Sequence, residues 1–163
     1  MTHAYVALGS NLGNAGQHVL DAIDALGRLP ATTLLATSRL YRTPPWGMLD
    51  QPDFVNAAVL LDTALGPHDL LDRLLTIERM HGRKRDGARW GPRTLDLDLL
   101  HMPGVVLADA RLTLPHPRIA ERAFVLLPLH DLAPELLLPG QGQVAALLAA
   151  ADGSGCEAIA TLR

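Results

Sequence analysis

The sequence has a single cysteine, Cys156, among its 163 residues. One thiol can form no disulfide within the chain, and it cannot build a cysteine-based zinc site. A chain of this length buries enough surface to fold without a disulfide or a structural metal. Its length is also typical of one domain, which we expect over residues 1–163. The lack of a disulfide framework favours a cytoplasmic protein.

Long apolar runs are also missing, although hydrophobic residues make up 48% of the chain. No segment reaches the roughly 18 consecutive apolar residues of a membrane-spanning helix. The opening MTHAYVALGSNLGN lacks the basic patch and the long apolar stretch of a secretion signal. We therefore expect no membrane partner.

An excess of positive charge is absent, because 17 acidic residues outnumber 14 basic ones and the formal net charge is −3. Nucleic-acid-binding domains are usually basic, so this balance argues against a nucleic-acid partner. Aromatic residues amount to only 4% of the chain, which leaves few rings to stack on bases.

Apolar periodicity predicts strands and helices in irregular alternation. The expected strands cover residues 4–8, 32–41, 54–61, 94–101 and, after a turn at Pro103-Gly104, 105–107. The expected helices run from an N-cap at Asn14 to Gly27, from Pro67 to Gly82, and over residues 143–150. Beyond Pro115 the apolar residues are interrupted by prolines at positions 117, 128, 134 and 139. Mixed elements with hairpins favour an α+β fold with a mainly antiparallel sheet.

Two aspartates alternate with leucines in the segment Leu95-Asp96-Leu97-Asp98-Leu99. On a strand, Asp96 and Asp98 point to one face, with their Cα atoms roughly 7 Å apart. Mg²⁺ suits such a pair, because it binds one or two carboxylates and completes its shell with water and substrate phosphates. The pattern therefore predicts a magnesium site, although a solvated strand face with two ordinary carboxylates produces the same alternation.

A basic segment directly precedes the aspartates, and it contains Arg83, Lys84, Arg85, Arg89 and Arg93. Guanidinium groups bind phosphate oxygens in pairs and stabilise charge on a transferring phosphoryl group. Arginines beside two carboxylates are typical of a metal-assisted phosphoryl-transfer site. The alternatives are a solvated charged loop and a surface that contacts RNA through its arginines and Trp90.

Two other segments are ambiguous on local grounds. Residues 9–14, Gly-Ser-Asn-Leu-Gly-Asn, lie between an expected strand and an expected helix, but they lack the lysine and the spacing of phosphate-binding loops. We expect a tight turn there. His116 lies between Pro115 and Pro117, whose stiff backbone could hold the imidazole toward a ligand. On local grounds alone, an incidental surface histidine is the favoured interpretation.

Phe54 and Phe124 are two of only six aromatic residues. Core packing is the ordinary role of such rings, and stacking on a flat ligand is the alternative. Asn56 lies two residues after Phe54, on the same strand face, so its amide could bind a heterocycle edge or buried backbone.

Taken together, the segments resemble the 6-hydroxymethyl-7,8-dihydropterin pyrophosphokinases, a folate-pathway family that transfers diphosphate from ATP to a pterin alcohol and releases AMP. The resemblance covers residue 4 to about residue 139 and rests on AYVALGSNLGN, LYRTPPWG with QPDFVNAAV, RWGPRTLDLDLL and LTLPHPRIAERAFVLLPL. The run RWGPRTLDLDLL is very specific. The resemblance implies a ferredoxin-like α+β sandwich, with a four-stranded antiparallel core sheet, packed helices and extra strands.

The resemblance also implies roles for individual residues. Asp96 and Asp98 match the family's ligands for two Mg²⁺ ions that bridge the ATP phosphates, and Arg83 and Arg93 match its catalytic arginines. The positions that match nucleotide contacts are Glu78, Arg85, Trp90, Leu99, Leu112, Thr113, His116 and Arg122.

For the second substrate, the resemblance implies that the pterin ring stacks between Phe54 and Phe124. Thr43 and Asn56 match the residues that bind its polar edge, and the backbone of Pro45 and Trp46 completes the pocket. The expected partners are ATP and the pterin alcohol alone, and we expect a monomer.

Other functions remain alternatives at this point. An RNA-binding module on a ferredoxin-like sheet would use the arginines and aromatic stacking. A kinase that transfers the γ-phosphate, or a nuclease, would share the carboxylate pair and Mg²⁺.

Overall fold

A six-stranded sheet carries the fold in the computed structural model, which describes residues 1–45, 50–81 and 94–160. Its strands are β1 (Thr2–Ser10), β2 (Thr32–Thr37), β3 (Leu40–Thr43), β4 (Phe54–Thr63), β5 (Asp96–His101) and β10 (Glu157–Ala160). They lie in the order β10-β3-β4-β1-β5, and β2 pairs with the far part of β4. All of these pairings are antiparallel.

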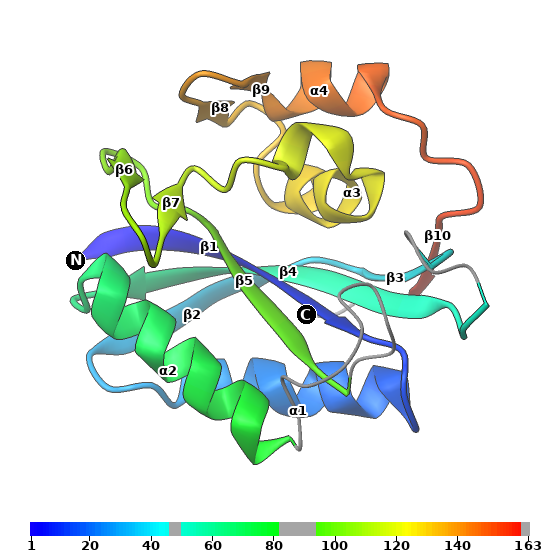
Figure 1. Cartoon of the computed structure of the whole chain (residues 1–163), viewed down its shortest axis with the longest axis horizontal. Coiled ribbons are helices and arrows are strands. Elements are labelled where there is room, and N and C mark those ends of the chain that lie inside the picture. Colours follow the sequence, from blue (N-terminus) through cyan, green and yellow to red (C-terminus); the bar gives the residue numbers. More distant parts are fainter. Residues whose placement is uncertain (46–49, 82–93, 161–163) are drawn as a thin grey trace.

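The helices divide between the two faces of the sheet (Figure 1). They are α1 (Ala15–Gly27) and α2 (Pro67–Met80) on one face, and α3 (Ala123–Leu132) and α4 (Val144–Ala150) on the other. β2 and β3 share one position beside β4, so the chain up to β5 follows the β-α-β-β-α-β order of the ferredoxin-like fold. The predicted α+β class with an antiparallel sheet is confirmed.

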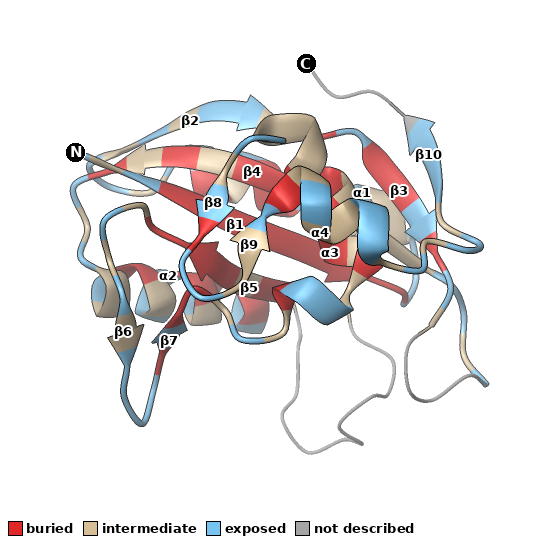
Figure 2. Ribbon diagram, turned by 90° about the horizontal axis from the view of Figure 1, so that it is seen from above, coloured by how far each residue is buried: buried red, intermediate tan, exposed pale blue. Residues whose placement is uncertain are grey.

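Side chains that alternate along the strands pack into two separate cores, one on each face of the sheet. Val6 and Leu8 of β1 pack in the core toward α1 and α2, whereas Tyr5 and Ala7 pack in the core beneath α3 and α4. Figure 2 shows the buried residues gathered along β1, β3 and β5. Because each core covers one face, the register of every central strand is specified by burial on both sides.

The predicted start of α1 is confirmed by its cap. The side chain of Asn14 accepts a hydrogen bond from the backbone nitrogen of Gln17 at 3.2 Å. α2 begins with Pro67, where a missing N–H costs nothing. The short helix expected over residues 143–150 is present as α4.

The sequence did not predict α3, which follows a single 3₁₀ turn, η1 (Ile119–Glu121). Pro128 lies inside this helix, and apolar residues occur around most of its circumference. A helix enclosed between a sheet and a second helix needs no polar stripe, so the helical period is hidden in the sequence.

Two strand predictions were wrong in detail. The strand expected over residues 32–41 is interrupted at Ser38 and Arg39, and the Ser38 hydroxyl accepts a hydrogen bond from the Ala58 nitrogen at 2.8 Å. The expected strand at 105–107 does not return along β5. Instead β6 (Leu107–Ala108) pairs with β7 (Thr113–Leu114). A second small hairpin, with β8 (Leu137–Leu138) paired to β9 (Gly142–Gln143), lies later in the chain.

No helix among the described residues has the length and apolar character needed to cross a bilayer.

A polar network fastens α3 to the start of β3. Asp131 accepts hydrogen bonds from the Tyr41 hydroxyl at 2.8 Å and from the Arg39 side chain at 3.0 and 3.1 Å. Burial alone would raise the pKa of Asp131, but the hydrogen bonds from Arg39 and Tyr41 outweigh it, and the pKa is lowered. Burial and then the hydrogen bond to Asp131 raise the pKa of Tyr41 to about 12.

Replacing Asp131 with Asn should lower the free energy of unfolding by about 1 kcal/mol at neutral pH, since the Arg39 partner is half exposed. A lowered folded-state pKa stabilises the protein above the unfolded value of 3.8, and this contribution is lost as pH falls through the folded value. Urea unfolding of both proteins at several pH values should therefore show a difference that disappears in acid. Asp24→Asn, at an exposed position of α1, is the control. A difference that persists undiminished in strong acid would contradict the assignment.

Candidate functional site

Asp96 and Asp98 lie half-buried at the beginning of β5, an edge strand of the sheet. Their neighbours across the ladder are Gly9 and Ala7 of β1, and the residue beyond Ala7, on β4, is Ala58. All three neighbours are small. The two carboxylates therefore stand beside small side chains on the α3 side of the sheet.

The opposite face of β5 is sealed by leucines. Leu95, Leu97 and Leu99 are at most 5% exposed and belong to the core beneath α1 and α2. This alternation confirms that the two aspartates share a face. It also means that the side chain of Leu99 points away from them, so only its backbone is available for the predicted nucleotide contact. Leu112 lies in the same core.

Glu78 of α2 is 2% exposed, and its contact with β5 is to the backbone. Its Oε2 accepts a hydrogen bond at 2.7 Å from the nitrogen of Leu97, the residue between the two aspartates. Among the described residues β5 pairs with β1 alone, so this carboxylate satisfies a donor on the other edge of the strand. In the described structure Glu78 thus positions the strand that carries the carboxylates.

His116 is held by its own backbone. Its nitrogen donates to the Leu100 carbonyl at 2.7 Å, and its carbonyl accepts from Nε2 of Gln141 at 2.8 Å. Ring atom Nδ1 accepts a hydrogen bond from the Arg118 nitrogen at 3.2 Å. An Nδ1 that accepts places the proton of a neutral imidazole on Nε2, which then becomes a donor.

The electrostatics of His116 link it to the predicted phosphate site. Burial, followed by the positive charges of Arg122 and Arg118, lowers its pKa to about 4, while Asp96 acts in the opposite direction. The ring is therefore neutral at physiological pH. Since both Asp96 and Arg122 act on it, the fold gathers three of the predicted residues at one place.

The predicted pterin-edge residues meet directly. Nδ2 of Asn56 donates to the Thr43 hydroxyl at 2.5 Å, and both side chains are buried. A Cβ atom at Gly9 would lie 2.6 Å from Oδ1 of Asn56, so only glycine leaves room for the amide. Sequence reasoning missed this role, because Gly9 appeared only as part of a turn.

Phe54 and Phe124 are half-buried, and Phe124 also packs against the core beneath α3 and α4. Phe54 belongs to β4, and its Cδ1 lies 4.0 Å from the position that a Cβ of Gly9 would take. Phe124 lies in the first turn of α3, where the guanidinium carbon of Arg122 is 5.7 Å from the ring centroid. Partly exposed rings are better suited to stacking on a flat ligand than to packing in a core.

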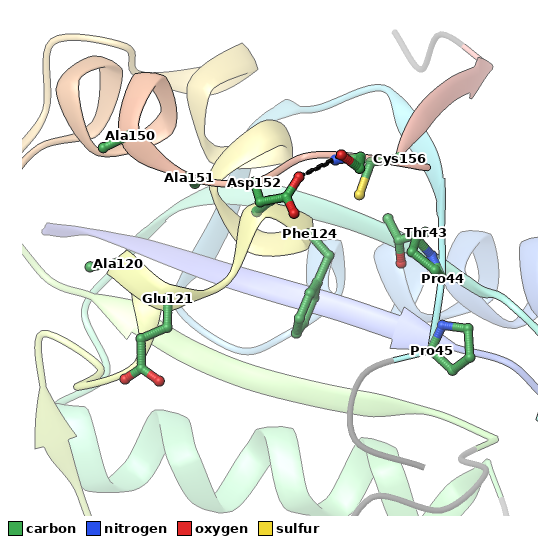
Figure 3. A pocket seen from close by; sticks show the side chains of 12 residues that line it. Thr43, Pro44, Pro45, Ala120, Glu121, Phe124, Ala150, Ala151, Asp152 and Cys156 are labelled. Atoms are coloured by element: carbon green, nitrogen blue, oxygen red, sulfur yellow. Dashed lines mark hydrogen bonds between the residues drawn. The ribbon is translucent and has the colours of Figure 1, made fainter. Parts of the chain in front are cut away.

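A cavity of about 470 Å³ opens beside Phe124 (Figure 3). The end of β3, the η1–α3 junction and the segment after α4 line it, with Thr43, Pro44, Pro45, Ala120, Glu121, Ala123, Phe124, Ala150, Ala151, Asp152, Ser154 and Cys156. Three of the predicted pterin contacts, Thr43, Pro45 and Phe124, line it, whereas Phe54 and Asn56 are not among its lining residues.

The other predicted nucleotide, catalytic and pterin residues lie elsewhere in the chain. Thr113 is exposed on β7. Arg83, Arg85, Trp90 and Arg93, together with Trp46, lie outside the described residues.

Asp96 and Asp98 are suitable Mg²⁺ ligands by their chemistry. The described residues contain no group of three or more histidine, cysteine or acidic side chains that could hold a metal ion. A two-carboxylate site fits an ion that takes much of its shell from water and substrate phosphates.

Two positioning contacts had no local sequence pattern. Asn11 donates to Oε1 of Gln51 at 2.9 Å and to the Pro52 carbonyl at 3.0 Å, so it ties the end of β1 to the segment before β4. Gln141, at the β8–β9 turn, holds the His116 carbonyl. Both contacts join residues at least 25 positions apart.

Comparison with known proteins agrees with this geometry. The family model of 7,8-dihydro-6-hydroxymethylpterin-pyrophosphokinase matches residues 5–134. The 2-amino-4-hydroxy-6-hydroxymethyldihydropteridine pyrophosphokinase of Methylorubrum extorquens is 47% identical, over 98% of this chain and 99% of that protein. The protein of the same name from Pseudomonas aeruginosa is 52% identical, over 94% of each chain.

Among solved structures, the HPPK-DHPS protein of Plasmodium falciparum superposes with a TM-score of 0.69 at 16% identity. The match covers 92% of this chain and 43% of that longer one, and it supports the fold alone. The sequence matches confirm the resemblance and the enzyme class that the motifs indicated. The chain belongs to the 7,8-dihydro-6-hydroxymethylpterin-pyrophosphokinase family.

Proposed function

We propose that this chain transfers the diphosphate of ATP to the hydroxymethyl group of 6-hydroxymethyl-7,8-dihydropterin and releases AMP, a step of folate biosynthesis. The observation that carries the proposal is the shared face of Asp96 and Asp98 beside His116 and Arg122. The enzyme acts as a cytoplasmic monomer of one domain, with no nucleic-acid or membrane partner.

Asp96 and Asp98 would hold Mg²⁺, with two ions expected from the family resemblance. When bound, magnesium neutralises phosphate charge and aligns the reacting oxygens. The half-buried position of both carboxylates beside Gly9 and Ala7 supports this role, because a phosphate chain needs space directly above them.

The nucleotide side is completed by hydrogen-bond donors. His116 is neutral and offers its Nε2 proton to a phosphate oxygen, while Arg122 adds a positive charge close by. Thr113 and the backbone at Leu99 and Leu112 contact the nucleoside. Arg85 and Trp90 bind ATP, and Arg83 and Arg93 stabilise the negative charge that grows during transfer.

The pterin lies between Phe54 and Phe124 and meets polar groups at its edge. The Asn56 amide and the Thr43 hydroxyl, already paired with each other, present a donor and acceptors in fixed positions. Backbone groups of Pro45 and Trp46 complete the pocket. Because these groups are preorganised, less entropy is lost when the alcohol is oriented toward ATP.

The reaction itself is the first test. Incubation with MgATP and the pterin alcohol should produce AMP and the pterin diphosphate in equal amounts, as measured by chromatography. Release of ADP would indicate an ordinary kinase and would overturn the proposal. Failure to consume ATP under these conditions would do the same.

Replacing Asp98 with Asn should lower kcat by about 10²–10³-fold, the usual loss when one electrostatic contact to developing charge is removed. The Mg²⁺ concentration needed for half-maximal activity should rise as well. Asp62→Asn, in the far part of β4 beside β2, is the matched control. Circular dichroism should be unchanged in both variants. Full activity of the Asp98 variant at low Mg²⁺ would refute the metal assignment.

Replacing Glu78 with Ala removes the acceptor of the Leu97 N–H. An unsatisfied buried donor costs about 1–3 kcal/mol, so both the free energy of unfolding and kcat should fall. Glu78→Gln keeps an acceptor oxygen and should recover most of the stability. Equal losses in the two variants, measured by thermal unfolding and initial rates, would show that the negative charge matters and not the hydrogen bond.

A further inference from the structure

The segment that follows α4 forms one side of the cavity beside Phe124 (Figure 3). Ala150, Ala151, Asp152, Ser154 and Cys156 all line it, together with Thr43 and Pro45. These residues lie beyond the part of the chain that the family model matches, which ends at residue 134. Neither the motifs nor the proposed chemistry assigns them a role.

This C-terminal wall, residues 150–156, is anchored to the strand that carries the pterin-edge residue Thr43. β10 follows the wall directly and pairs with β3, with Glu157 opposite Arg42 and Ala158 opposite Tyr41. Arg42 and Glu157 also form an ion pair. A displacement of either strand therefore moves both sides of the cavity.

The wall has a specified shape. Oδ1 of Asp152 accepts hydrogen bonds from the nitrogen and the hydroxyl of Ser154, at 3.0 and 2.6 Å. The Cys156 nitrogen donates to the Gly153 carbonyl at 3.1 Å. Gly155 has φ +80°, a left-handed conformation that glycine adopts at no steric cost.

Gly155 lies against Pro44. A Cβ atom at position 155 would be 3.4 Å from Cγ and 3.6 Å from Cδ of the proline ring. A methyl group there would lie at the short end of van der Waals contact with the ring, and the left-handed backbone would be strained, so any residue other than glycine disfavours the present position of the wall against Pro44. Pro44 lies between Thr43 and Pro45, and a shift of its ring displaces both.

We infer that the C-terminal wall closes the outer side of the pterin pocket, and that Gly155 is a positioning residue that holds Pro44, and through it Thr43, in place. The inference rests on the proposed function, because it takes the Thr43–Phe124 cavity as the pterin side of the site. It gives residues 150–156 a part in pterin recognition and none in ATP binding.

Cys156 supplies a direct test in the unmodified protein, since it is the single thiol of the chain. Burial and then the nearby Asp152 carboxylate raise the pKa of this thiol, so alkylation by iodoacetamide is followed at one alkaline pH. With a non-hydrolysable ATP analogue and Mg²⁺ present, adding 6-hydroxymethylpterin should slow alkylation by about tenfold, because access limits the reaction of a shielded thiol. The nucleotide analogue alone should change the rate less than about twofold.

The control reporter is Leu35→Cys in a Cys156→Ser background, an exposed site on β2. Its rate should not respond to the pterin. An unchanged Cys156 rate at saturating pterin would overturn the inference, as would equal protection by the nucleotide alone. If the wild-type enzyme still released AMP from ATP and the pterin alcohol, the inference would fail while the proposed function stood.

A pair of glycine variants tests the positioning role. Gly155→Ala should raise the Kd for 6-hydroxymethylpterin about tenfold, a cost at the lower end of overpacking effects. The Kd for the ATP analogue should change less than about twofold, because its proposed site lies at β5 and His116. Gly104→Ala, in the turn after β5, is the matched control: Gly104 has a similar left-handed backbone with φ +86°, and its Cβ would meet nothing within 4 Å.

The two ligands separate positioning from general damage. Equal weakening of pterin and nucleotide binding by Gly155→Ala, or unchanged pterin binding in a folded variant, would overturn the positioning role. If Gly155→Ala does not fold, Pro44→Ala tests the same contact from the other side. It should weaken pterin binding selectively, and an unchanged pterin Kd would overturn the role.

Discussion

Along β5 every second side chain turns toward α3, and this places Asp96 and Asp98 together while Leu97 and Leu99 close the core on the other face. Each fully buried leucine contributes about 1.5–3 kcal/mol. A one-residue slip of the strand would bury the carboxylates and expose the leucines. The hydrophobic core thus specifies which face of the edge strand can collect divalent cations and phosphate.

Small residues on the neighbouring strands extend this arrangement across the sheet. Gly9 pairs with Asp96 on one side and with Asn56 on the other. Because Gly9 has no Cβ, the Asn56 amide can lie over β1 and reach Thr43. The proposed phosphate end and the proposed pterin end of the site are therefore joined by one row of residues that crosses three strands.

The upper side of the site depends on parts of the chain that are distant in sequence. Asp131 fastens α3 to β3 through Arg39 and Tyr41, and α3 carries Phe124. Gln141 holds the carbonyl of His116. The Asp131 contacts hold the helix that carries Phe124, and the Gln141 contact holds His116. The substrates would touch both of these side chains.

The sequence by itself determined the features that depend on neighbours along the chain. It determined the shared face of Asp96 and Asp98, the cap at Asn14 and the residues that carry the family resemblance. Tertiary structure decided the rest: the helix around Pro128, the roles of Gly9 and Glu78, and the cavity wall that ends at Cys156. The physical reason is that side-chain alternation and capping act within a few residues, whereas each of the others is set by packing between segments that only the folded sheet brings together.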